Sequence, residues 1–108
     1  KLILGLPGNP TSALVTARLF LAPLLAGLSG RKADDATAFR TWRLGGGLSA
    51  SGDRESFVLA RVCGEAAIPL DDQSSAGQRA LAGADLLIRL PPHSRAFALG
   101  DEVQALCF

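Results

Sequence analysis

The chain has 108 residues, which is enough for one domain, or for one small domain and a piece of a second. Apolar residues make up 48% of the chain and charged residues 19%, so the chain can build a core and is not a disordered tail. Eleven basic residues against ten acidic ones give a net charge of +1, which argues against a general nucleic-acid binder.

The chain opens on a short apolar run, residues 2–6, whose proline and glycine boundaries predict a buried parallel strand. A helix follows, because Asn9 can cap it and Pro10 stands at the first helical position, where a missing N–H group costs nothing. We expect this helix to end near Leu28 and to be kinked or interrupted at Pro23. Since the chain has no methionine and begins within a strand, we expect it to be the C-terminal part of a longer protein.

The predicted helix is apolar nearly all round, and two interpretations compete. A membrane span would fit the apolar residues, but Arg18 and Pro23 lie within the run and leave too short an apolar stretch to cross a bilayer. Burial on several sides by other parts of a longer protein is the preferred interpretation, so no membrane association is expected.

Residues 31–37 are small and polar and predict a linker. The pattern then changes to five short strands separated by glycine, proline and serine turns, at residues 39–44, 57–63, 66–70, 86–90 and 102–107. Such closely spaced strands indicate a small barrel or a compact sandwich. The predicted fold class is therefore α+β, with a strand–turn–helix followed by a small all-β, barrel-like domain.

The two cysteines, Cys63 and Cys107, do not form a CxxC pair, and the single histidine, His93, cannot complete a zinc site with them. We therefore expect no metal site in this chain. The interpretation we prefer is a pair of buried, reduced thiols, as is typical of a cytosolic protein.

The segment from Gly5 to Ser12 carries the clearest local signal for chemistry. Two prolines stiffen the turn, Gly8 lets a ligand approach the backbone, and the following helix offers free N–H groups with no acidic residue in its first turn. With the polar groups of Asn9, Thr11 and Ser12, these parts predict an oxyanion or phosphate site. An ordinary strand–turn–helix corner would use the same residues only to shape the bend.

The chain resembles the molybdopterin molybdenumtransferase family, which includes MoeA and the gephyrin E-domain. The motifs that carry this resemblance occur in the family's order along the whole chain. They are Leu-Pro-Gly-Asn-Pro at 6–10, Pro-Leu-Leu-x-x-Leu-x-Gly at 23–30, Gly-x-Arg-x-x-Phe at 52–57, the Gln73–Ser75 block, the 81–91 run ending in Leu-Pro, and Gly-Asp-x-Val at 100–103.

The resemblance implies a cytoplasmic, homodimeric enzyme that transfers molybdenum from molybdate to adenylylated molybdopterin with Mg²⁺ and releases AMP. Residues 1–30 would be the end of its α/β domain, 31–37 a linker, and 38–108 its C-terminal β-domain. By the resemblance, the active-site cleft would contain these residues: Pro7 and Pro10 in the catalytic loop, and Gly8, Asn9, Thr11, Ser12, Arg54, Ser74 and Ser75 as anion-binding residues. The chain alone should be inactive, because the metal- and nucleotide-binding residues belong to earlier domains.

Two departures from the family pattern touch the implied site. Ala76 replaces a family glycine, and Leu59 stands where many members carry a second arginine. A non-catalytic function, in which the β-domain serves assembly or partner docking, is therefore the alternative hypothesis. Convergence of the proline loop with Arg54 and Ser75 would favour the enzyme.

Overall fold

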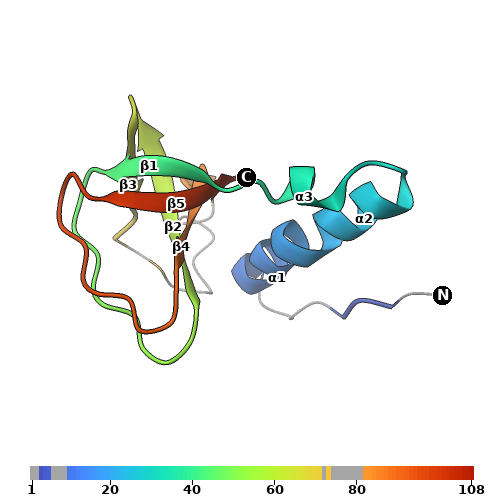
Figure 1. Cartoon of the computed structure of the whole chain (residues 1–108), viewed down its shortest axis with the longest axis horizontal. Coiled ribbons are helices and arrows are strands. Elements are labelled where there is room, and N and C mark those ends of the chain that lie inside the picture. Colours follow the sequence, from blue (N-terminus) through green and yellow to red (C-terminus); the bar gives the residue numbers. More distant parts are fainter. Residues whose placement is uncertain (1–2, 6–9, 72, 74–81) are drawn as a thin grey trace. The chain divides into compact units, whose positions relative to one another are not determined.

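The computed structural model describes residues 3–5, 10–71, 73 and 82–108, with residues 10–12 described by their backbone. The chain divides after Ala38 into two compact units, and each is described by itself. Figure 1 labels the elements of both units.

The first unit is built on one continuous helical run from Pro10 to Leu28, as the sequence predicts. It consists of α1 (Pro10–Thr16), the π-helical segment η1 (Ala17–Leu21) and α2 (Ala22–Leu28). The interruption expected at Pro23 does not occur, because the helix widens just before the proline. The Ala22 N–H group donates to the Ala17 carbonyl, a bond across five residues, and Pro23 then falls in the first turn of α2, where it is tolerated.

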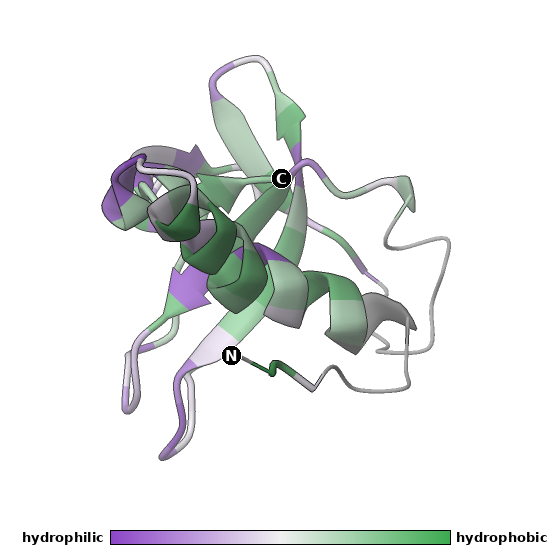
Figure 2. Cartoon of the chain, turned by 90° about the vertical axis from the view of Figure 1, so that its right-hand side faces the viewer, coloured by the Kyte–Doolittle hydropathy of each residue, from purple (hydrophilic) through white to green (hydrophobic). Residues whose placement is uncertain are grey.

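The helical run is coloured largely as hydrophobic in Figure 2, and several of its large apolar side chains are exposed. Phe20 and Leu28 are 60% and 68% exposed, whereas Ala26 is buried. Within the described residues, no helix is both long and apolar enough to cross a membrane.

Two parts of the first unit differ from the predictions. The described residues of the N-terminal run, 3–5, are not in a strand, because a parallel strand exists only through hydrogen bonds to neighbours and no described residue pairs with them. The predicted linker contains a one-turn helix, α3 (Ala33–Ala36). Its first turn holds Asp34 and Asp35, which favour a helix N-terminus, and Arg18 donates to the Ala36 carbonyl.

The second unit is a closed barrel. Of the two architectures that the strand pattern allows, a small barrel or a compact sandwich, the barrel is therefore the correct one. All five predicted strands are confirmed, with bounds within one residue: β1 (Arg40–Leu44), β2 (Ser56–Cys63), β3 (Ala66–Pro69), β4 (Leu86–Leu90) and β5 (Glu102–Cys107). Their order around the barrel is β1-β3-β2-β4-β5. The β1–β3 pair is parallel and the other four are antiparallel.

The barrel interior is filled by one face of each strand. Leu86, Ile88, Ala60 and Ala105 are all at most 1% exposed and belong to one core cluster, against which Trp42 packs. Trp42 is partly buried there. A second apolar row of Leu59, Leu87 and Leu106 is paired across β2, β4 and β5 and is also buried, on the opposite face of these strands.

The expectation of buried cysteines is wrong. Cys63 and Cys107 are both exposed. Each is the last residue of its strand, where the side chain is at the end of the barrel and has left the core.

A tight turn leads into β5 and depends on one carboxylate. Gly100 adopts a φ of 89°, which favours glycine, and the Asp101 N–H group donates to the Ala98 carbonyl at 3.1 Å. The Asp101 carboxylate accepts from the Ala98 N–H group at 2.8 Å and from Arg95 at 3.0 Å. The Ala98 bond first, and then Arg95, lower the pKa of Asp101.

A lowered pKa in the folded state makes this contribution to stability depend on pH. The contribution is present above the unfolded pKa of Asp, about 3.9, and is lost as the pH falls through the lower folded value. We therefore expect Asp101→Asn to melt at a lower temperature than the wild type at pH 7. The two melting curves should converge as the pH is lowered below about 4. Asp53→Asn is the control, because Asp53 accepts no hydrogen bond from the described residues. A difference in melting temperature between Asp101→Asn and the wild type that stayed the same at all pH values would contradict this role of the Asp101 carboxylate.

Candidate functional site

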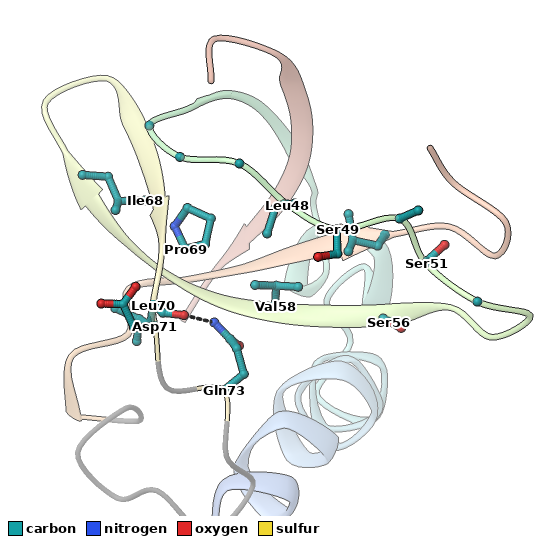
Figure 3. A pocket seen from close by; sticks show the side chains of 16 residues that line it. Leu48, Ser49, Ser51, Ser56, Val58, Ile68, Pro69, Leu70, Asp71 and Gln73 are labelled. Atoms are coloured by element: carbon teal, nitrogen blue, oxygen red, sulfur yellow. Dashed lines mark hydrogen bonds between the residues drawn. The ribbon is translucent and has the colours of Figure 1, made fainter. Parts of the chain in front are cut away.

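A cavity of about 650 Å³ opens in the wall of the barrel, where the chain leaves β1 (Figure 3). Its cause is the short ladder between β1 and β3, which pairs only Arg43 with Ala66 and Leu44 with Ala67. The Gly45 N–H group adds one more bond to the Ala67 carbonyl, at 2.9 Å. The loop of Gly45, Gly46 and Gly47 continues past the last paired residues and lines the cavity together with Ile68 and Pro69 of β3.

The first glycine of this loop is required by the close approach to β3. A Cβ atom at Gly45 would lie 2.8 Å from Cγ1 of Ile68, which real Cβ atoms do not do. At Gly46 the corresponding contact, with Cδ of Pro69, is an ordinary 3.6 Å. The three-glycine run, which lacks the GK[ST] of a phosphate loop, therefore serves to let the backbone leave the ladder beside β3.

Gln73 holds the rim of the cavity to the barrel. Its Nε2 group donates to the carbonyls of Leu59 at 2.8 Å and Leu70 at 2.7 Å, and its Oε1 atom accepts from the Leu59 N–H group at 2.8 Å. Figure 3 draws the bond to Leu70. The side-chain amide thus pairs with β2 as a further peptide of β3 would.

A pair of serines fixes the opposite end of the cavity. The Ser51 hydroxyl donates to the Pro91 carbonyl at 2.6 Å and accepts from the Ser94 N–H group at 2.8 Å. The Ser51 N–H group donates in turn to the Ser94 carbonyl at 3.2 Å. Ser51 is therefore engaged in structural bonds, and the loop before β2 is tied to the loop after β4.

The predicted anion-binding residues are placed only in part. Arg54 is exposed in the loop before β2 and is not among the described residues that line the cavity. Pro10 begins α1, and no acidic residue stands in the first turn of that helix, as predicted. Thr11 and Ser12 continue α1. Pro7, Gly8, Asn9, Ser74 and Ser75 lie outside the described residues. The convergence of these residues on one cleft therefore stays a prediction.

The two departures from the family pattern differ in what the structure says of them. Leu59 is 3% exposed and lies in the second apolar row, so this position holds a packing residue. Arg61, two residues further along β2, is exposed. Ala76 lies outside the described residues.

The comparison with protein families decides the identity of the barrel. Residues 41–108 match the model of the MoeA C-terminal region (domain IV). The chain belongs to this family. The matched residues span all of the barrel except the first residue of β1. None of the curated proteins compared with the chain matches it.

Solved structures of proteins named for this pathway share the fold over nearly the whole chain. A molybdopterin biosynthesis MoeA protein from Pyrococcus horikoshii OT3 has a TM-score of 0.80 and 19% identity, with 94% of this chain and 26% of that protein covered. A second P. horikoshii MoeA structure has a TM-score of 0.78 and 27% identity, with 95% of this chain and 25% of that protein covered. A molybdenum cofactor biosynthesis protein from Pyrococcus furiosus has a TM-score of 0.79 and 21% identity, with 94% of this chain and 36% of that protein covered. The chain thus spans well under half the length of each.

Sequence reasoning missed the cavity and the role of Gln73. Gly45, Gly46 and Gly47 were visible as a turn, but nothing in their spacing says that the loop leaves a parallel ladder. In the sequence, Gln73 stands out only as part of a family motif. A glutamine shortly after a short strand is compatible with many roles. Its two bonds to the backbone of Leu59, 14 residues away, are not encoded in local sequence.

Loss of the Gln73 amide should destabilise the barrel. Gln73→Ala leaves the N–H group of the buried Leu59 without this partner, whereas the Leu59 carbonyl keeps its bond from the Leu70 N–H group. An unpaired buried polar group costs about 1–3 kcal/mol. Gln73→Glu should be destabilising too, because a carboxylate cannot donate to two carbonyls. Chemical denaturation gives the free energy of unfolding. The matched control is Gln104→Ala, which removes one exposed hydrogen bond to Thr41. It should change the free energy of unfolding by less than about 0.5 kcal/mol. Equal stabilities of the two alanine variants would refute the role of Gln73.

Proposed function

We propose that this chain is the C-terminal part of a molybdopterin molybdenumtransferase, a homodimeric cytoplasmic enzyme that transfers molybdenum from molybdate to adenylylated molybdopterin. The observation that carries the proposal is the match of residues 41–108 to the MoeA C-terminal region, which makes the barrel a domain of a molybdenum cofactor biosynthesis family. The likeness to three structures from that pathway supports it over the first unit as well.

In this proposal the substrate anions are held by two segments. The first is the loop with Pro7 and Pro10, where Gly8 admits the ligand and Asn9, Thr11 and Ser12 provide polar groups at the start of α1. A helix start without acidic side chains favours an oxyanion such as molybdate. The second segment is the barrel's contribution, with the guanidinium of Arg54 and the hydroxyls of Ser74 and Ser75.

Mg²⁺, which the family implies, has no binding site among the residues described. In that part of the chain no three His, Cys, Asp or Glu side chains gather in a group that could hold a metal ion. The residues present therefore do not fit the ion, and no step of the proposed reaction is assigned to it here. The chain alone is proposed to be inactive.

The proposal is tested by grafting this chain in place of the matching quarter of the P. horikoshii MoeA protein. We expect the 108-residue chain alone to show no molybdenum insertion in an in vitro cofactor assay, and the graft to restore it. Arg54→Ala in the graft should reduce insertion, and Arg61→Ala, on the exposed side of β2, is the matched control. A well-folded but inactive graft would overturn the enzyme proposal and favour a docking function.

The prolines of the first segment should matter more for activity than for folding. Replacing both Pro7 and Pro10 with Ala should lower stability by only about 0.4–1 kcal/mol per site, because each proline restricts mainly the unfolded chain. A loop displaced by about 1 Å can lower a rate about a hundredfold, because the reactants lose their geometry. We therefore expect the doubly substituted graft to melt near the unmodified graft and to insert molybdenum about a hundredfold more slowly. If the melting temperature and the insertion rate fell together, or if the rate were unchanged, the loop would be only a structural corner.

A further inference from the structure

We propose that a basic trough between α2 and α3 docks an extended acidic segment of a partner protein, through two carboxylates that lie two residues apart in that segment. The trough is a cavity of about 560 Å³, and the described residues that line it all belong to the first unit. The proposal uses no residue of the barrel and does not depend on the proposed transferase reaction.

The floor of the trough is made of small side chains. Helix α3 packs beside α2 (Figure 1). Ala22 and Ala26, one turn apart on α2, line the cavity together with Ala36 of α3. Methyl groups leave open the space between two helices that larger side chains would fill, so the backbone of a bound segment can approach closely.

Two exposed cations stand at one end of this floor. Gly30 turns the chain after α2 with a φ of 79°, and the Arg31 N–H group donates back to the Ala26 carbonyl at 2.8 Å. This turn places Arg31 and Lys32 on the lining of the cavity. Neither side chain forms an ion pair or a hydrogen bond with a described residue, so an incoming anion displaces no partner among them.

A third cation is held at the other end of the floor. Arg18 donates to the carbonyl of Ala36, the last residue of α3, and this hydrogen bond fixes the position of the guanidinium at the cavity. Ala36 follows Lys32 by four residues, which is about 6 Å along a helix. The cations are therefore presented at two places, about one helical turn apart.

This spacing fits an extended peptide better than a single small anion. In an extended chain, residues i and i+2 point to the same side and lie about 7 Å apart. One carboxylate of such a pair can meet Arg31 and Lys32 while the other meets Arg18, whereas a single oxyanion would leave one end unmatched. The charges agree as well, because three cations and one carboxylate, Asp35, give the described lining a net charge of 3 − 1 = +2.

A protein partner is favoured over a nucleic acid. Proteins that bind single strands combine a basic groove with aromatic side chains on which the bases stack. The described residues that line the trough include no Phe, Tyr or Trp. The carboxylate of Asp35 would also repel a continuous phosphate backbone, and the net charge of the whole chain is only +1.

The test is the binding of two isomeric peptides to the 108-residue chain, measured by the anisotropy of a neutral fluorophore on each peptide. The first peptide, Gly-Glu-Ser-Glu-Gly with blocked ends, has its glutamates two residues apart. The second, Gly-Ser-Glu-Glu-Gly, has them adjacent, so that they point to opposite sides of an extended chain.

Two variants of the chain disrupt the trough in different ways. The first combines Arg31→Gln with Lys32→Gln and removes two exposed charges. Its matched control combines Arg43→Gln with Arg61→Gln, which removes the same charge from exposed positions of the barrel. The second, Ala22→Leu, fills the floor without a change in charge. Circular dichroism checks that each variant is folded, and the charge variant carries the test if Ala22→Leu is not.

We expect saturable binding of the first peptide, which the charge variant weakens at least tenfold, Ala22→Leu at least threefold and the control less than twofold. The second peptide should bind at least threefold more weakly than the first. Neither molybdate nor a thymidine oligonucleotide should displace the first peptide more than sodium chloride does at equal ionic strength. Absence of saturable binding, equal affinities for the two peptides, equal weakening by the control, or displacement by molybdate or the oligonucleotide would each overturn the proposal.

Discussion

The barrel is closed by its shortest and least regular ladder, the parallel pairing of β1 with β3. Two residue pairs and the added bond from Gly45 are all that join these strands, whereas the other four pairings are antiparallel and four or five pairs long. A parallel ladder has to be left by a chain that runs alongside its partner, and it cannot turn back in a hairpin. The chain leaves here within van der Waals reach of Ile68, and a side chain at Gly45 would prevent it. The cavity is the direct consequence of closing a barrel in this way.

Where the ladder stops, side chains take over the pairing of backbone groups. Gln73 pairs with both backbone groups of Leu59, next to the point where β3 ends. The Asp85 carboxylate accepts from the Val62 N–H group at 2.9 Å, beyond the last residue of β2 that pairs with β4. Ser51 ties two loops that share no strand pairing. Backbone groups need partners where a ladder stops, and at these strand ends the barrel provides them as side-chain amides, carboxylates and hydroxyls.

The strands were predictable because their signals are local. Alternating apolar residues bounded by turn residues located all five strands, and the glycine and proline positions marked the turns between them. The π-helical segment was not predictable in the same way. Pro23 signals a disturbance, but whether a helix breaks or widens depends on hydrogen bonds such as that from Ala22 to Ala17. The burial of Cys63 was misjudged for a related reason, since a strand pattern does not say where the barrel ends.

The site was less predictable than the fold because the cavity depends on where the hydrogen-bonded pairing of β1 with β3 stops. Family motifs named Arg54 and Gln73, yet Arg54 is exposed and Gln73 pairs with backbone, while Gly46 and Gly47, which have no side chain, line the cavity. Main-chain atoms carry no residue-type signal, so no motif can announce them. They do have a physical property that side-chain sites lack. Backbone donors and acceptors hold no net charge at any pH, so recognition through them is indifferent to titration. Where a barrel wall opens at the end of a ladder, the groups it exposes are therefore set by the strand pairing and not by the type of residue at that position.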